Sequence, residues 1–113
     1  MINLKDGVVA WGLSKEVWIA IEKTYTLILT APYLKQRIFT ITSCRDGVHK
    51  DGSLHYKGEA FDFRTWYWRK EEVGKLVLDL MRELGSDYDV VLERDHCHVE
   101  YDRKYKILVE REA

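Results

Sequence analysis

The sequence has 113 residues, of which 46% are hydrophobic and 33% charged, and its formal net charge is −1. This length predicts one domain, residues 1–113, with enough chain to bury a core without disulfide bonds. The 18 basic and 19 acidic residues form no strongly basic segment, so we expect neither a nucleic-acid partner nor a polybasic membrane contact.

The N-terminal residues lack the basic and apolar regions of a secretory signal, and no stretch approaches the roughly 18 apolar residues of a membrane span. The cysteines, Cys44 and Cys97, are too few for a disulfide framework. We therefore expect cytoplasmic synthesis with reduced thiols, and a monomer. A substrate outside the cytoplasm would have to be reached by a separate route.

The first half of the chain predicts one helix and two strands. Ser14 is a good N-cap for a helix over residues 14–30, and Pro32 fits its end. Residues 37–42 and 59–64 alternate apolar and polar side chains, as half-buried strands do. Between them, residues 44–54 contain two Asp-Gly pairs and are predicted to be a loop. The apolar residues that recur at helical spacing in the helix are Val17, Trp18, Ile21, Tyr25 and Ile28.

The second half predicts a helix over residues 70–84, with Gly85 just after its end. We interpret the charged residues of this helix, Glu72 among them, as its solvated face. Strands are predicted at 88–94, 96–101 and 105–109, the last two as a hairpin. The fold class is therefore α+β, a single domain with helices packed on a mostly antiparallel sheet.

Two segments carry residues that suit a metal ion. In the first, His55 at the end of the loop precedes Asp62 in the second strand. Asp62 lies between Phe61 and Phe63, so it takes the face opposite those rings, and a carboxylate there needs a partner. In the second segment, His96 and His98 share one face of a strand.

Cys97, between these histidines, takes the other face of the strand and is a poor ligand candidate. Two histidines, one carboxylate and an open position for water are typical of catalytic rather than structural zinc. The alternative is that the aspartate forms a salt bridge and the histidines pack or lie on the surface. Spacing alone leaves these interpretations about evenly matched.

The stretch SLHYKGEAFDFR, followed by a helix and DHCHVEY, resembles the zinc D-alanyl-D-alanine carboxypeptidase family, which includes phage L-alanyl-D-glutamate endopeptidases (endolysins). The resemblance covers about residues 38–101. The family pattern is S-x-H-x-x-G-x-A-x-D, then an acidic residue three positions before a final histidine. The residues that match it are Ser53, His55, Gly58, Ala60, Asp62, Asp95 and His98.

The resemblance implies one zinc ion, with His55, Asp62 and His98 as its ligands. It implies that Asp95 is the general base and that His96 lies beside the metal. Arg45 matches an arginine that holds substrate or stabilises the developing oxyanion, and Ser53 joins it as a substrate-binding candidate.

The hedgehog signalling domain is also similar, because it shares the fold and a histidine six residues before the first ligand, where His49 stands here. Hedgehog domains keep the zinc but are not known as effective peptidases. Arg45 and Asp95 favour the enzymes. The expected mechanism has Asp95 accept a proton from the attacking water, while zinc with Arg45, His49 or His96 stabilises the oxyanion.

Asp95 and His98 have opposite parity on an ideal strand, so the chain must bend or bulge near Asp95 for both to reach one metal. Glu93 is the fallback base, although a surface charge is the favoured interpretation of it. The aromatic residues 66–68 would either floor a substrate groove or, as we favour, pack at the start of the second helix.

The function expected from these features is a zinc metallopeptidase that hydrolyses a bond next to a D-residue in peptidoglycan stem peptides. The phage-lysin branch fits the short chain without a signal peptide, because such enzymes leave the cytoplasm through a separately supplied membrane hole. Carboxypeptidase and endopeptidase activities both stay open. The alternatives are a hedgehog-like zinc-bearing binding module and a peptidase with a different peptide substrate.

Overall fold

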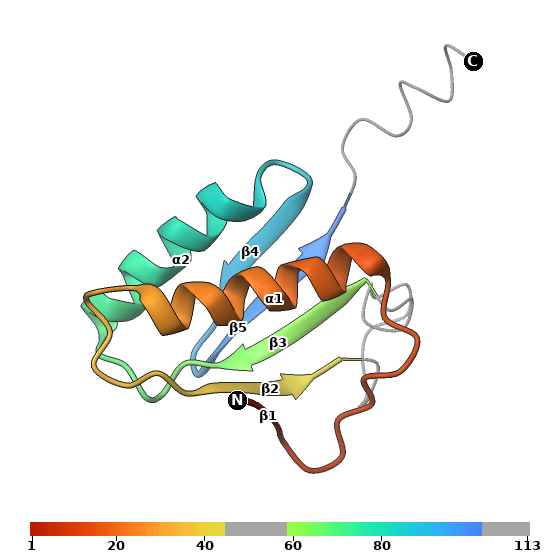
Figure 1. The fold of residues 1–113 in the computed structure, drawn as a ribbon, viewed down its shortest axis with the longest axis horizontal. Coiled ribbons are helices and arrows are strands. Elements are labelled where there is room, and N and C mark those ends of the chain that lie inside the picture. Colours follow the sequence, from red (N-terminus) through yellow and green to blue (C-terminus); the bar gives the residue numbers. More distant parts are fainter. Residues whose placement is uncertain (45–58, 103–113) are drawn as a thin grey trace.

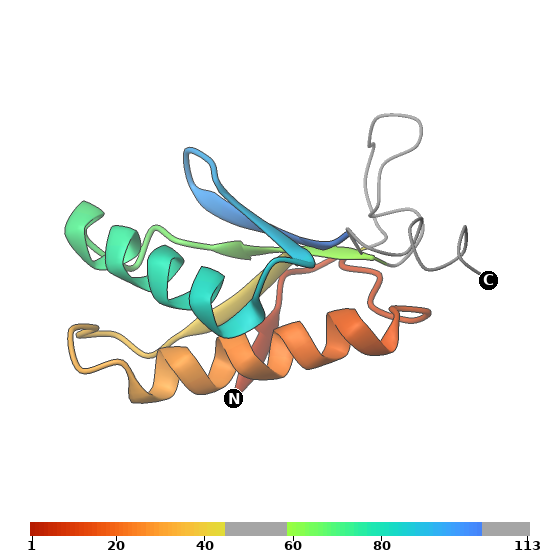
Figure 2. The same ribbon diagram turned by 90° about the horizontal axis from the view of Figure 1, so that it is seen from above.

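The computed structural model describes residues 1–44 and 59–102. Within these ranges, two helices lie on one face of a five-stranded sheet (Figures 1 and 2). This arrangement confirms the predicted α+β class with a mostly antiparallel sheet. The elements in chain order are β1 (Ile2–Leu4), α1 (Lys15–Thr30), β2 (Phe39–Ser43), β3 (Ala60–Arg64), α2 (Lys70–Leu84), β4 (Tyr88–Leu92) and β5 (His96–Tyr101).

The strand order in the sheet is β1-β2-β3-β5-β4. β1 runs parallel to β2, and every other neighbouring pair is antiparallel. The sequence did not predict β1. This strand has three residues and pairs with β2, which follows α1 in the chain, so it leaves no local pattern. β3 and β5 lie at the centre, each paired on both edges.

α1 begins as predicted. The Ser14 hydroxyl accepts a 3.2 Å hydrogen bond from the backbone N–H of Val17, which satisfies one of the free donors at the helix start. Val17, Ile21 and Ile28 are buried against the sheet. Trp18, which the helical spacing included in the apolar set, is instead 48% exposed.

α2 has the predicted bounds, but the interpretation of Glu72 as a solvated residue is wrong. Its side chain is buried. One carboxylate oxygen accepts from the backbone N–H of Arg69 at 2.8 Å, and the other accepts from the backbone N–H of Lys35 at 3.2 Å. Glu72 therefore caps α2 and also fastens the segment before β2 to this helix.

The core lies between the helices and one face of the sheet. Phe61 and Phe63 are fully buried there, which places Asp62 on the opposite face, as predicted. Cys97 and Val99 of β5 are buried in the same way, so the histidines of that strand take the face of Asp62. Burial of each Phe side chain stabilises the fold by about 1.5–3 kcal/mol, so the alternation strongly fixes which face each side chain takes.

β5 forms an antiparallel hairpin with β4. The predicted strand at 105–109 lies outside the described residues, but β3 and β4 occupy both edges of β5. The predicted hairpin of 96–101 with 105–109 therefore also lies outside the part of the chain that the structure describes. In the part of the chain that the structure describes, no helix has the length and apolar character needed to cross a membrane.

Candidate metal centre

The predicted site residues divide into two groups by their place in the chain. Asp62, Asp95, His96 and His98 lie among the described residues. The remaining predicted site residues, Arg45, His49, Ser53 and His55, lie outside them.

Asp62 and His98 face each other across the centre of the sheet. They are directly paired in the antiparallel register of β3 and β5. His98 Nδ1 lies 2.8 Å from Asp62 Oδ1, at hydrogen-bond distance. Their side chains are 13% and 18% exposed, respectively. The sheet ladder thus brings together two of the three predicted ligands, from positions 36 residues apart in the chain.

Glu100 is a third member of this cluster, which sequence reasoning missed. His98 Nε2 lies 2.9 Å from Glu100 Oε1, so both ring nitrogens of His98 face carboxylates. Burial lowers the pKa of His98, but the hydrogen bonds and charges of Asp62 and Glu100 outweigh it and hold the pKa above its ordinary value. The alternation of β5 was the available signal, because Glu100 follows His98 by two positions.

Asp95 lies in the turn between β4 and β5, one residue before β5 begins. Strand parity therefore does not govern the direction of its side chain. Asp95 Oδ1 accepts a 2.8 Å hydrogen bond from His96 Nδ1, and this bond lowers the pKa of Asp95 below its ordinary value. His96 Nε2 in turn lies 3.9 Å from Asp62 Oδ2 and 3.8 Å from Glu93 Oε2. His96 therefore stands between Asp95 and the Asp62–His98 pair.

Asp62 and His98 carry donor atoms of the types that zinc binds. An imidazole nitrogen and a carboxylate oxygen are both zinc ligands, and tetrahedral bonds of about 2.0–2.1 Å place ligand atoms about 3.3 Å apart. The 2.8 Å between His98 Nδ1 and Asp62 Oδ1 is close to that spacing. A metal-bound histidine also donates its second N–H to a carboxylate as a rule, which is the place of Glu100 here.

A different set of three ligand atoms lies within 4.8 Å of one another among the described residues, namely Asp89, Glu100 and Asp102. All three are carboxylates, which suit calcium or magnesium better than zinc. This set therefore does not support the predicted zinc ion.

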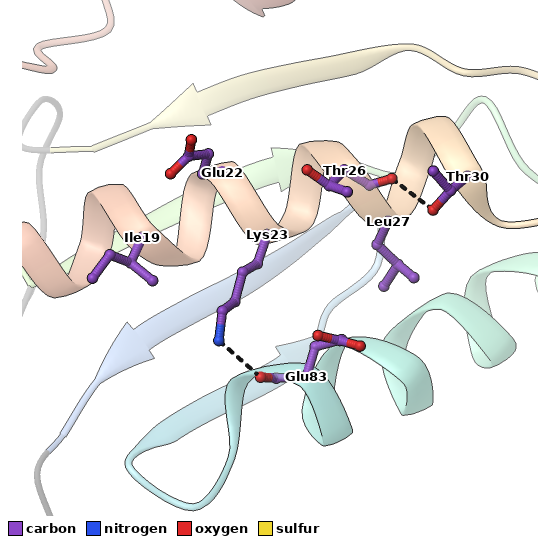
Figure 3. Close-up of a pocket in the computed structure, with 7 residues that line it drawn as sticks. All are labelled: Ile19, Glu22, Lys23, Thr26, Leu27, Thr30 and Glu83. Carbon is purple, nitrogen blue, oxygen red and sulfur yellow. Dashed lines mark hydrogen bonds between the residues drawn. The ribbon is translucent and has the colours of Figure 1, made fainter.

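A pocket between α1 and α2 has no connection with the candidate metal centre (Figure 3). It lies on the helical side of the molecule, whereas Asp62 and His98 take the opposite face of the sheet. Lys23 Nζ crosses it to donate a 3.3 Å hydrogen bond to the backbone carbonyl of Glu83. The residues that line it are Ile19, Glu22, Lys23, Thr26, Leu27, Thr30 and Glu83.

Comparison with known proteins adds nothing to these observations, because no family model matches the chain and neither does any curated protein.

Proposed function

We propose that this protein is a zinc metallopeptidase that hydrolyses a peptide bond in peptidoglycan stem peptides. The main support is the in-register pair of Asp62 and His98, 2.8 Å apart on the face of the sheet that the helices leave free. These are two residues of the motif that resembles the D-alanyl-D-alanine carboxypeptidase and endolysin family. The fold class expected from that resemblance agrees with two helices on a mostly antiparallel sheet.

In this proposal, Asp62 and His98 hold one zinc ion together with His55. The chemistry that zinc supplies when bound is the activation of a water molecule at neutral pH. Glu100 holds the ring of His98 in place through the 2.9 Å contact to Nε2. The same proposal includes the specific fold that hedgehog domains share with these peptidases.

Asp95 is the proposed general base. The hydrogen bond from His96 Nδ1 lowers its pKa, so the carboxylate is ionised at neutral pH and can accept a proton. His96 directs its other nitrogen toward Asp62, where a donor would stabilise negative charge that develops beside the ligands. Glu93, 3.8 Å from the same nitrogen, is the second candidate for the base.

Arg45, His49 and Ser53 are proposed to contact the substrate or its oxyanion. The protein would be made in the cytoplasm and would act on the cell wall once released, as phage lysins do.

The decisive experiment is incubation of the purified, zinc-loaded protein with peptidoglycan fragments, followed by mass spectrometry of the products. New amine termini next to a D-residue are expected, and their position distinguishes carboxypeptidase from endopeptidase cleavage. Chelator-treated protein is the matched control and should leave the fragments intact. Intact fragments after incubation with folded, zinc-retaining protein would contradict the proposal and favour a zinc-bearing binding module of the hedgehog type.

A further inference from the structure

Arg64 is the last residue of β3 and shares the face of the candidate metal centre. It follows Asp62 by two positions, so the two side chains leave the strand on the same side. In the sheet register Arg64 lies directly opposite His96. The backbone distance from Asp62 to Arg64 is about 7 Å, which an extended peptide covers in two residues.

The guanidinium of Arg64 lies over an exposed aromatic ring. Its Cζ lies 4.0 Å from the ring centroid of Trp66, which is 63% exposed. The neighbouring residues Tyr67 and Trp68 pack near the start of α2, as predicted. Trp68 is buried and donates to the Gln36 carbonyl at 2.6 Å, and the Tyr67 hydroxyl lies 2.7 Å from Thr40 Oγ1. Trp66 is thus the member of the trio that stays on the surface.

The charge of Arg64 has no carboxylate partner within the described residues, although acidic groups are close by. The carboxylates of Asp62, Glu93 and Asp95 each approach His96, and no ion pair among the described residues includes Arg64. A guanidinium that stacks through its flat face keeps its edge N–H groups available. Those donors match a carboxylate in bidentate geometry.

We propose that Arg64, held by Trp66, is a subsite that binds a carboxylate of the peptide substrate about two residues from the bond that is cleaved. The inference rests on the proposed peptidase function, and it adds a specificity residue that the motif does not include. Arg64 provides the charge and the paired donors. Trp66 is a positioning residue that keeps the guanidinium turned away from the acidic groups around His96.

The test compares synthetic stem peptides whose carboxylates, at D-glutamate or at the C-terminus, are free or amidated one at a time. For the zinc-loaded wild type, amidation of the carboxylate that enters the subsite should lower kcat/KM about tenfold, as for a hydrogen-bonded charge pair. The Arg64→Gln variant should cleave the free and amidated peptides at similar rates. Arg64→Lys should retain part of the preference, because lysine keeps the charge but loses the planar fork.

Two matched controls separate this role from general effects. Arg82→Gln removes an exposed arginine that pairs with Asp79 on α2, and it should leave the preference for the free acid unchanged. Trp66→Leu should weaken the preference, whereas Trp18→Leu, which removes a half-exposed tryptophan of α1, should not. Equal losses on free and amidated peptides in Arg64→Gln would show a structural role and overturn the inference.

Binding distinguishes failure of the subsite from failure of the proposed function. Isothermal titration calorimetry with the same peptides gives affinities whether or not they are cleaved. Tighter binding of a free-acid peptide that disappears in Arg64→Gln, without any cleavage, would support the subsite and contradict the peptidase. A wild type that shows no preference in cleavage or in binding would overturn the subsite.

Discussion

The backbone N–H of Thr65, one residue beyond β3, donates a 3.1 Å hydrogen bond to the backbone carbonyl of Asp95. This bond fastens the turn between β4 and β5 to the end of the strand that carries Asp62. It involves main-chain atoms alone, so it does not depend on the Asp95 side chain. The position of Asp95 near the candidate metal centre should therefore survive substitution of that side chain.

Replacing Asp95 with Asn should abolish hydrolysis and leave the fold and the zinc content unchanged. An amide cannot accept the proton, and loss of a general base lowers kcat by about 10²–10⁴-fold. Steady-state cleavage of stem peptides and metal analysis of the purified variant measure the two effects. Asp6→Asn, an exposed change in the loop after β1, is the control. Wild-type turnover by Asp95→Asn would show that the base lies elsewhere, and Glu93→Gln would then be the variant to measure.

Zinc should raise the melting temperature of the wild type but not of His98→Ala or His55→Ala. Binding at a hundred times Kd stabilises the folded state by about 2.7 kcal/mol, or about 10 °C for a domain of this size. Calorimetric melts with and without zinc measure the shift. Asp95→Asn should keep the full shift, because its side chain is not a proposed ligand. An undiminished shift in His98→Ala would contradict the ligand assignment.

Glu72 should stabilise the fold at neutral pH and lose this effect in acid. The hydrogen bond from the Arg69 N–H outweighs burial and lowers the pKa of Glu72 below its ordinary value of 4.5. Its contribution is therefore complete above about pH 4.5 and is lost as the pH falls through the lower, folded-state pKa. Glu72→Gln should melt below the wild type at pH 7, and the difference should shrink toward pH 3. Glu71→Gln, at the exposed neighbouring position, should melt like the wild type at both pH values.

Both cysteines should be unreactive in the folded protein. Cys44 and Cys97 are both buried, and burial, helped by the charges of Asp62 and Glu93, raises the pKa of Cys97 to about 12. At pH 8 its thiolate is then about a thousandfold scarcer than at the ordinary pKa of 9.0. A chromogenic disulfide reagent should label the thiols in urea and not in native buffer. Rapid labelling of Cys97 in native buffer would contradict its placement in the core.

The raised pKa of Cys97 also predicts a loss of stability in alkali. The folded state holds the thiol proton more tightly than the unfolded chain does. The contribution is therefore complete below about pH 9 and declines as the pH rises toward about 12. Urea unfolding of the wild type and of Cys97→Ala across this range gives the free energy of unfolding as a function of pH. This free energy should fall less steeply with pH in the variant, and equal slopes would contradict the assignment.

The sequence predicted the elements whose signals are local. The Ser14 cap and the apolar spacing located α1, and the Phe61-Asp62-Phe63 alternation located β3 and assigned its faces. Features that depend on contacts between distant segments were missed. β1 is three residues long and is defined by its pairing with β2, and the hairpin of β4 with β5 was not predicted. Glu72 resembled a solvated helix residue because its partner, the Lys35 N–H, lies 37 positions away.

In the candidate site, too, the sequence predicted features with a local pattern and missed contacts between segments. Alternation on β5 indicated that His96 and His98 share a face, and the family resemblance predicted that Asp62 lies beside His98. A bend near Asp95 was expected, but its geometry is not encoded in a local pattern, so the hydrogen bond between Asp95 and His96 was not predicted. Nor did any local pattern place Arg64 on Trp66, because a charged residue at the end of a strand is ordinarily solvated.

The two central strands have a consequence for how a metal would be exchanged. β3 and β5 each have a hydrogen-bonded neighbour on both edges, so neither can open without breaking two ladders. We therefore expect the backbone amides of the strands that carry Asp62 and His98 to exchange slowly. A metal ion held there could be removed by a chelator and returned many times while amide hydrogens around it stay protected, unlike the ion of a zinc finger, whose loss unfolds the chain.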